Sequence, residues 1–69
     1  MKIKTLKQYR EDKNLTQLEA SKILEINTIY LSHIENGRRN PSDSLKNKMS
    51  KLYKVPVTDI FLASQLPKW

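Results

Sequence analysis

The chain has 69 residues, no cysteine and a single histidine, and its 13 lysines and arginines outnumber its 7 acidic residues, for a formal net charge of +6. A chain this short buries only about 60% of the surface that it exposes when unfolded, which leaves little room for both a core and a deep substrate cavity. Length and composition therefore predict one domain over residues 1–69 and disfavour an enzyme, a disulfide framework and a thiolate metal site. The basic excess favours a polyanionic partner, with nucleic acid ahead of an anionic membrane surface.

The composition predicts an all-α chain. One glycine and three prolines interrupt it, and there is no strand-like alternation of apolar and polar residues. The first amphipathic helix is predicted from Lys4 to about Lys13, with Leu6 on its apolar side.

The second helix is predicted over Gln17 to Leu24, after the run Thr16-Gln17-Leu18-Glu19. This run fits a capping box, in which the Thr16 hydroxyl and the Glu19 carboxylate each accept from the other's backbone amide. Ala20, Ile23 and Leu24 are expected to face inward in some combination.

A third helix is predicted from Thr28 to Asn36. Asn27 is a favourable N-cap for it, and Leu31 and Ile34 are its apolar positions. Gly37 supplies the left-handed residue that ends it.

A basic loop, Arg38-Arg39-Asn40-Pro41, precedes a fourth helix that starts at Ser42, or at Asn40 with Pro41 in the first helical position. The apolar positions of this helix are Leu45, Met49, Leu52 and Tyr53, and Lys46, Lys48 and Lys51 are expected to form a solvated face. Pro56 opens a short fifth helix through Leu62, and residues 63–69 are expected to be a tail.

Two short helices joined by a three-residue turn, over about residues 16–36, have the spacing of a helix-turn-helix. The run Leu15-Thr16-Gln17, the run Ile34-Glu35-Asn36-Gly37 and Pro41 stand at offsets that resemble the XRE or Cro/CI family, the lambda-repressor-like DNA-binding domains. This resemblance implies a compact five-helix domain whose third helix lies in the major groove of DNA.

The resemblance also implies which residues contact the bases: Asn27, Thr28, Ile29 and His33. Their chemistry is suitable, because asparagine can pair with adenine, threonine can bond to several bases, isoleucine can touch the thymine methyl group and histidine can donate to guanine. A plain solvated helix surface is the alternative interpretation.

Phosphate contacts are expected at Gln17, which in this family also braces the third helix, and at a second group after that helix. The second group is Asn36, Arg38, Arg39, Asn40 and Ser42. Backbone amides at helix starts add partial positive charge there, and ordinary surface solvation is again the alternative.

Two further features follow from the resemblance. Arg10 and Glu35 match positions that pair across the first and third helices, and we read them as a structural ion pair and not as a catalytic couple. Glu25 stands where the family often has glycine, so a left-handed backbone is expected at a non-glycine residue, and Ser21 stands where a small alanine is usual.

The leading functional hypothesis is a sequence-specific transcriptional regulator, a repressor that binds double-stranded DNA as a homodimer on an inverted repeat. The expected dimer contacts are Leu62, Leu66 and Trp69. We expect a complete single-domain regulator in the cytoplasm, bacterial or phage-encoded, with no metal, cofactor, small-molecule ligand or membrane partner.

The sequence leaves other classes open. An antitoxin-like module that binds a toxin, with DNA binding secondary, is the main alternative. A binder of anionic membranes is less suitable because no long helix has a broad apolar face. Enzyme activity is disfavoured because His33 has neither a cysteine nor a second histidine to work with.

Overall fold

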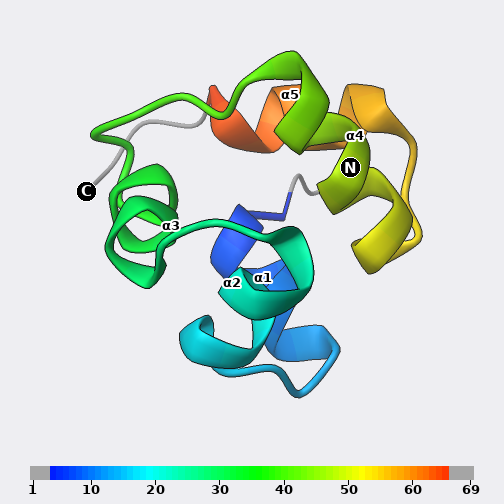
Figure 1. Cartoon of the computed structure of the whole chain (residues 1–69). Helices are drawn as coiled ribbons and strands as arrows, with labels where there is room; N and C mark the ends of the chain where they lie inside the picture. Colours follow the sequence, from blue (N-terminus) through cyan, green and yellow to red (C-terminus); the bar gives the residue numbers. More distant parts are fainter. Residues whose placement is uncertain (1–3, 66–69) are drawn as a thin grey trace.

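The computed structural model describes residues 4–65, and within them the chain forms five helices and no strand (Figure 1). The helices are α1 (Leu6–Asp12), α2 (Gln17–Leu24), α3 (Thr28–Glu35), α4 (Asp43–Tyr53) and α5 (Val57–Ser64). The all-α, five-helix prediction is confirmed. None of these helices is long and apolar enough to cross a membrane.

Side-chain caps fix where four of the helices begin. Thr5 and Thr16 each form a complete capping box, and Asn27 and Ser42 accept the amides of Ile29 and Leu45. The predicted starts of α2 and α3 are therefore confirmed, and Ser42 is the correct choice of the two for α4. The first helix begins two residues later than predicted because Thr5 ends the extended segment before it.

The helix ends depend on residues in the left-handed conformation, at Asn14, Glu25, Gly37 and Lys54. After α3, the amide of Gly37 donates to Ile34 and the next amide donates to His33, at 3.1 and 2.9 Å. This hydrogen-bond pattern is the Schellman motif, and it ends α3 one residue earlier than predicted. Glu25 takes the expected left-handed backbone, with φ of 61° and ψ of 43°.

Replacing Lys54 with glycine is expected to raise the free energy of unfolding by about 1 kcal/mol, because a non-glycine residue in this conformation is strained. Lys54 has φ of 57°, and its exposed side chain makes no hydrogen bond or ion pair within the described residues. Urea denaturation measures the change. A loss of stability would contradict it, and Lys51→Gly, inside the same helix, is the destabilising control.

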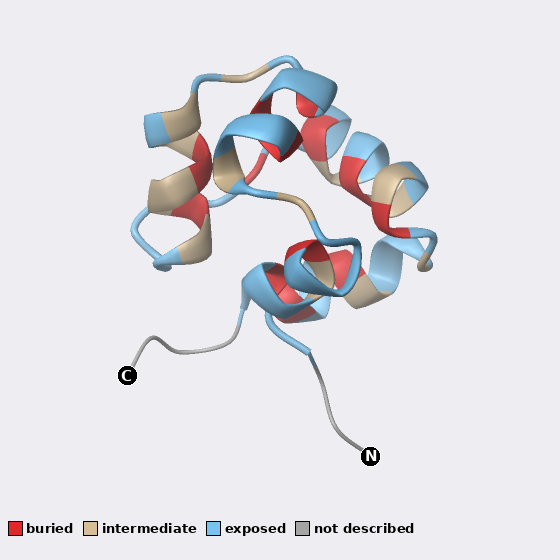
Figure 2. Ribbon diagram, turned by 90° about the horizontal axis from the view of Figure 1, so that it is seen from below, coloured by how far each residue is buried: buried red, intermediate tan, exposed pale blue. Residues whose placement is uncertain are grey.

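Every helix contributes buried residues to one core, and each helix carries buried positions in the ribbon of Figure 2. Its buried members are Leu6, Ala20, Leu24, Leu31, Ile34, Leu45, Met49, Tyr53, Ile60 and Ala63. Of the three α2 residues expected to face inward, Ala20 and Leu24 do so, whereas Ile23 is 54% exposed.

The last helix is longer than predicted. Ala63 and Ser64, which were expected in the tail, belong to α5, and Ala63 is buried in the core. Burial of the Ala63 methyl group explains the extra half turn.

A small polar residue lies where α2 meets α3. Ser21 is 2% exposed, its hydroxyl donates to the Leu18 carbonyl at 2.8 Å, and its Oγ is 2.9 Å from the Thr28 Oγ1. Because the Ser21 proton is used on the carbonyl, Thr28 is the donor in the contact between the two hydroxyls. A serine is therefore small enough for the two helices to approach closely here.

Candidate nucleic-acid interface

A buried ion pair joins α1 to α3. The Arg10 Nε and Nη2 atoms donate to the two Glu35 carboxylate oxygens at 2.7 and 3.1 Å, and the Arg10 Nη1 donates to the Leu15 carbonyl at 2.8 Å. The side chains of Arg10 and Glu35 are only 8% and 2% exposed, and the hydrogen bond to Glu35 raises the pKa of Arg10 above its usual value. The expected pairing is thus confirmed, and it fixes α3 against the rest of the domain.

Gln17 contributes a third hydrogen bond to the same carboxylate. Its Nε2 donates to the Glu35 Oε1 at 3.1 Å, from the first turn of α2. The predicted bracing of α3 by Gln17 is present in this contact. Gln17 is half-buried.

A tyrosine pair lies against this network. The Tyr53 ring stacks on Tyr9 with 6.1 Å between the ring centroids, and the Tyr53 hydroxyl is buried without a hydrogen-bond partner among residues 4–65. Burial raises the pKa of Tyr53 to about 12.

Replacing Tyr53 with phenylalanine is therefore expected to leave the domain as stable as before, or about 1 kcal/mol more stable, because an unpaired buried hydroxyl is removed. The wild-type protein should also lose stability between pH 10 and 12, since the unfolded state ionises its tyrosine first. This loss should be smaller in Tyr53→Phe. Denaturant unfolding at pH 7 and pH 11 checks both statements; a markedly less stable Tyr53→Phe would contradict the first.

The exposed face of α3 carries the residues predicted to read bases. Ile29 is 65% exposed and His33 is partly exposed, on the side opposite the buried Leu31 and Ile34. An exposed large apolar side chain next to an imidazole on a short helix supplies a methyl-contacting group and a hydrogen-bonding group on one surface.

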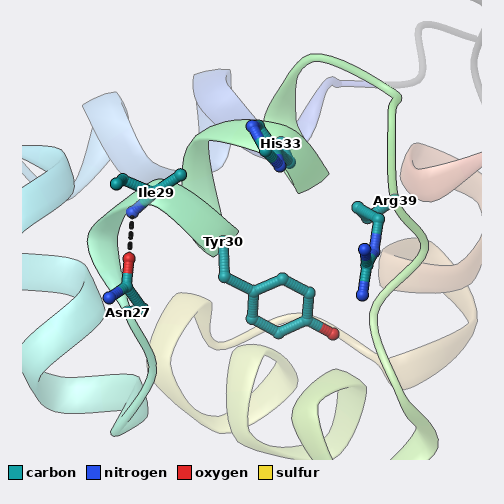
Figure 3. A pocket seen from close by; sticks show the side chains of 5 residues that line it. All are labelled: Asn27, Ile29, Tyr30, His33 and Arg39. Carbon is teal, nitrogen blue, oxygen red and sulfur yellow. Dashed lines mark hydrogen bonds between the residues drawn. The ribbon is translucent and has the colours of Figure 1, made fainter.

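The two residues at the start of α3 already have structural roles. The Asn27 Oδ1 accepts the Ile29 amide at 2.7 Å (Figure 3), and the Thr28 hydroxyl donates to Ser21. Asn27 therefore offers the two hydrogens of its Nδ2 to a ligand, and Thr28 offers an acceptor. The bidentate pairing of asparagine with adenine uses both the side-chain oxygen and the side-chain nitrogen. In such a pairing the Asn27 Oδ1 would have to accept from adenine as well as from the Ile29 amide.

A shallow depression of about 450 Å³ borders this face (Figure 3). Asn27, Ile29, Tyr30, His33 and Arg39 line it, and the Arg39 guanidinium carbon lies 5.8 Å from the centroid of the Tyr30 ring. This cation–π contact holds the guanidinium beside the third helix. Sequence reasoning missed Tyr30, although its spacing of three residues from both Asn27 and His33 places it on the flank of that face.

The second group of predicted phosphate contacts lies in and next to the loop between α3 and α4. Arg38, Arg39 and Asn40 are all exposed, and the Asn36 Nδ2 donates to the Ser32 Oγ at 3.4 Å. The Ser42 Oγ accepts the first-turn amide of α4, so its proton remains available. Asp43 follows directly with a 99% exposed side chain, and its charge opposes an anion at this helix start.

The predicted dimer contacts lie partly outside the described residues. Leu62 is 45% exposed on α5, and Val57 and Phe61 of the same helix are 41% and 48% exposed. The Lys46 ammonium lies 5.0 Å from the centroid of the Phe61 ring. Leu66 and Trp69 fall outside residues 4–65.

Comparison with known proteins agrees with this geometry. The chain matches the helix-turn-helix family model over residues 6–60. It is 39% identical over 57 residues to an uncharacterized HTH-type transcriptional regulator of Methanocaldococcus jannaschii, covering 83% of this chain and 86% of that protein. It is 28% identical over 64 residues to another such protein of Archaeoglobus fulgidus, covering 93% and 90%. No solved structure matches significantly.

Proposed function

Because the chain belongs to the helix-turn-helix family of DNA-binding transcriptional regulators, we propose that it is a sequence-specific repressor that reads an inverted-repeat operator as a homodimer. The observation that carries this proposal is the face of α3, where the exposed Ile29 and the partly exposed His33 lie beside Arg39, whose guanidinium contacts the Tyr30 ring. The network around Glu35 holds this face rigidly on the domain. Such a regulator acts where the DNA is, in the cytoplasm.

Base reading is assigned to the start and the exposed face of α3. With the helix in the major groove, Ile29 contacts a thymine methyl group and His33 donates to a guanine. The free Asn27 amide hydrogens donate to an acceptor on a base edge, and the Thr28 oxygen accepts from a base amino group. No cofactor is needed for this recognition.

Phosphate contacts are assigned to the flanks of the same helix. Arg39 and Tyr30 lie on one flank, where a groove-bound helix faces a sugar-phosphate backbone. The remaining phosphate contacts are Gln17, Asn36, Arg38, Asn40 and Ser42.

A homodimer supplies the second half-site, because one short recognition helix contacts few bases. The exposed Val57, Phe61 and Leu62 of α5 form the apolar surface available for it. Sedimentation at micromolar concentration is expected to show a dimer or a concentration-dependent equilibrium. A strict monomer, even on operator DNA, would contradict the dimer.

A salt titration tests DNA binding against an antitoxin-like role in which DNA binding is secondary. Fluorescence anisotropy with a labelled duplex is expected to give a log Kd that rises linearly with log salt, at about 0.9 per phosphate contacted. A weak affinity with a slope near zero would contradict DNA binding and favour a protein partner. The matched variant is Arg38→Ala, which should lower the slope by about 0.9.

A further inference from the structure

A second hollow, on another part of the molecule, has no role in the proposed DNA contacts. It measures about 360 Å³ and lies between the end of α2 and the last turns of α4. Its lining residues are Ile23, Leu24, Glu25, Lys48, Lys51 and Leu52. None of them belongs to the α3 face, to the loop after α3 or to the apolar surface of α5.

This α2–α4 groove has an apolar floor and wall. Leu24 is 1% exposed, and Leu52 is partly buried and packs against the core. Ile23, which also lines the groove, is 54% exposed. A single exposed isoleucine is ordinary on a protein surface. Here, however, the side chain borders a hollow into which another apolar side chain can fit and be shielded from water.

The rim of the groove is positively charged. Lys48 and Lys51 are three residues apart on α4, which is nearly one helical turn, so their side chains are neighbours on the same side of the helix. The one acidic residue of the lining, Glu25, is neutralised by Lys48 at 3.0 Å. Lys51 is exposed and makes no ion pair within residues 4–65, so the groove keeps an unmatched positive charge.

We propose that the α2–α4 groove is a docking site for an acidic amphipathic helix of a partner protein. One apolar residue of that helix fills the hollow beside Ile23, and a carboxylate one turn away pairs with Lys51, as in other helix-in-groove contacts. The solvated face that the sequence suggests for Lys48 and Lys51 is thus an interaction surface. The inference does not rest on DNA binding.

The test titrates the full-length, methyl-labelled protein with a short synthetic peptide that carries leucines at i, i+3 and i+4 and glutamates beside them. The methyl resonances of Ile23, Leu24 and Leu52 are expected to shift, and a peptide with lysine in place of glutamate should leave them unchanged. Lys51→Glu is expected to weaken binding about fivefold, the fold-change that corresponds to the upper end of the range for one exposed ion pair. Lys7→Glu makes the same charge change at an exposed position of α1 and should leave binding unchanged.

Several results would overturn the proposal. These are no shift with the glutamate peptide, equal shifts with the lysine peptide, or shifts confined to α3 or α5. Other occupants are identified by three further experiments. Two are titrations with a DNA duplex and with anionic phosphatidylserine vesicles, and the third is a series of increasing protein concentrations without any ligand. If one of them shifts the groove resonances and the glutamate peptide does not, the groove is a surface for DNA, lipid or a second copy, and the proposal is wrong.

Discussion

Replacing Arg10 with alanine is expected to lower the free energy of unfolding by about 3–5 kcal/mol, because it leaves the Glu35 carboxylate buried without its cation. The Leu15 carbonyl loses its donor at the same time. Small domains have total stabilities of about 5–15 kcal/mol, so at the lower end of this range the loss would unfold a measurable fraction of the protein. Thermal and urea denaturation followed by circular dichroism give the value.

Two further variants separate the buried charge from ordinary loss of packing. Arg10→Met combined with Glu35→Leu is expected to be far less destabilised than Arg10→Ala, since neither charge is then left alone. Lys4→Ala removes a pair with Asp12 whose side chains are half exposed, and it should barely change stability. Equal losses from Arg10→Ala and Lys4→Ala would show that the pair between α1 and α3 is not a principal support of the fold.

The second large effect is expected on DNA recognition. His33→Ala should lose about 1–3 kcal/mol of discrimination at one base pair of each half-site, while other positions keep their preference. Arg39→Ala should weaken all sequences alike and reduce the salt slope by about 0.9. Affinities for a panel of single-base operator variants, measured at several salt concentrations, separate the two effects.

The contact with Tyr30 provides a control for Arg39. Tyr30→Phe keeps the ring against which the guanidinium lies, whereas Tyr30→Ala removes it. Tyr30→Ala should therefore approach the affinity of Arg39→Ala, and Tyr30→Phe should stay close to the wild type. A uniform loss from His33→Ala as well would show that the face of α3 does not read the bases.

Most of the fold could be predicted from the sequence because helix starts and ends are set by local chemistry. The Thr16 capping box and the Asn27 cap placed α2 and α3, and Gly37 predicted the end of α3 to within one residue. The extent of α5 could not be predicted this way, because burial of Ala63 against other helices lengthens it. The exposure of Ile23 could not be predicted either. Helical periodicity did not show whether the buried face of α2 includes Ile23 or only Ala20 and Leu24.

The candidate site was predicted less completely. The family resemblance indicated Arg10, Glu35 and Gln17, and in the structure Arg10 and Gln17 both donate hydrogen bonds to the Glu35 carboxylate. The competing roles of Asn27 and Thr28 depend on side-chain geometry, which residue type does not reveal. The contact of Arg39 with Tyr30 joins residues from the loop and the helix, and no spacing rule places a loop side chain.

Selection of binding sites from random DNA examines DNA binding, sequence preference and operator symmetry in one measurement. We expect an enriched inverted repeat whose half-site centres lie about 34 to 36 Å apart, one turn of the double helix. His33→Ala should enrich a repeat altered at the same position in each half. Recovery of no common sequence, while the protein remains folded, would contradict sequence-specific DNA binding by this domain.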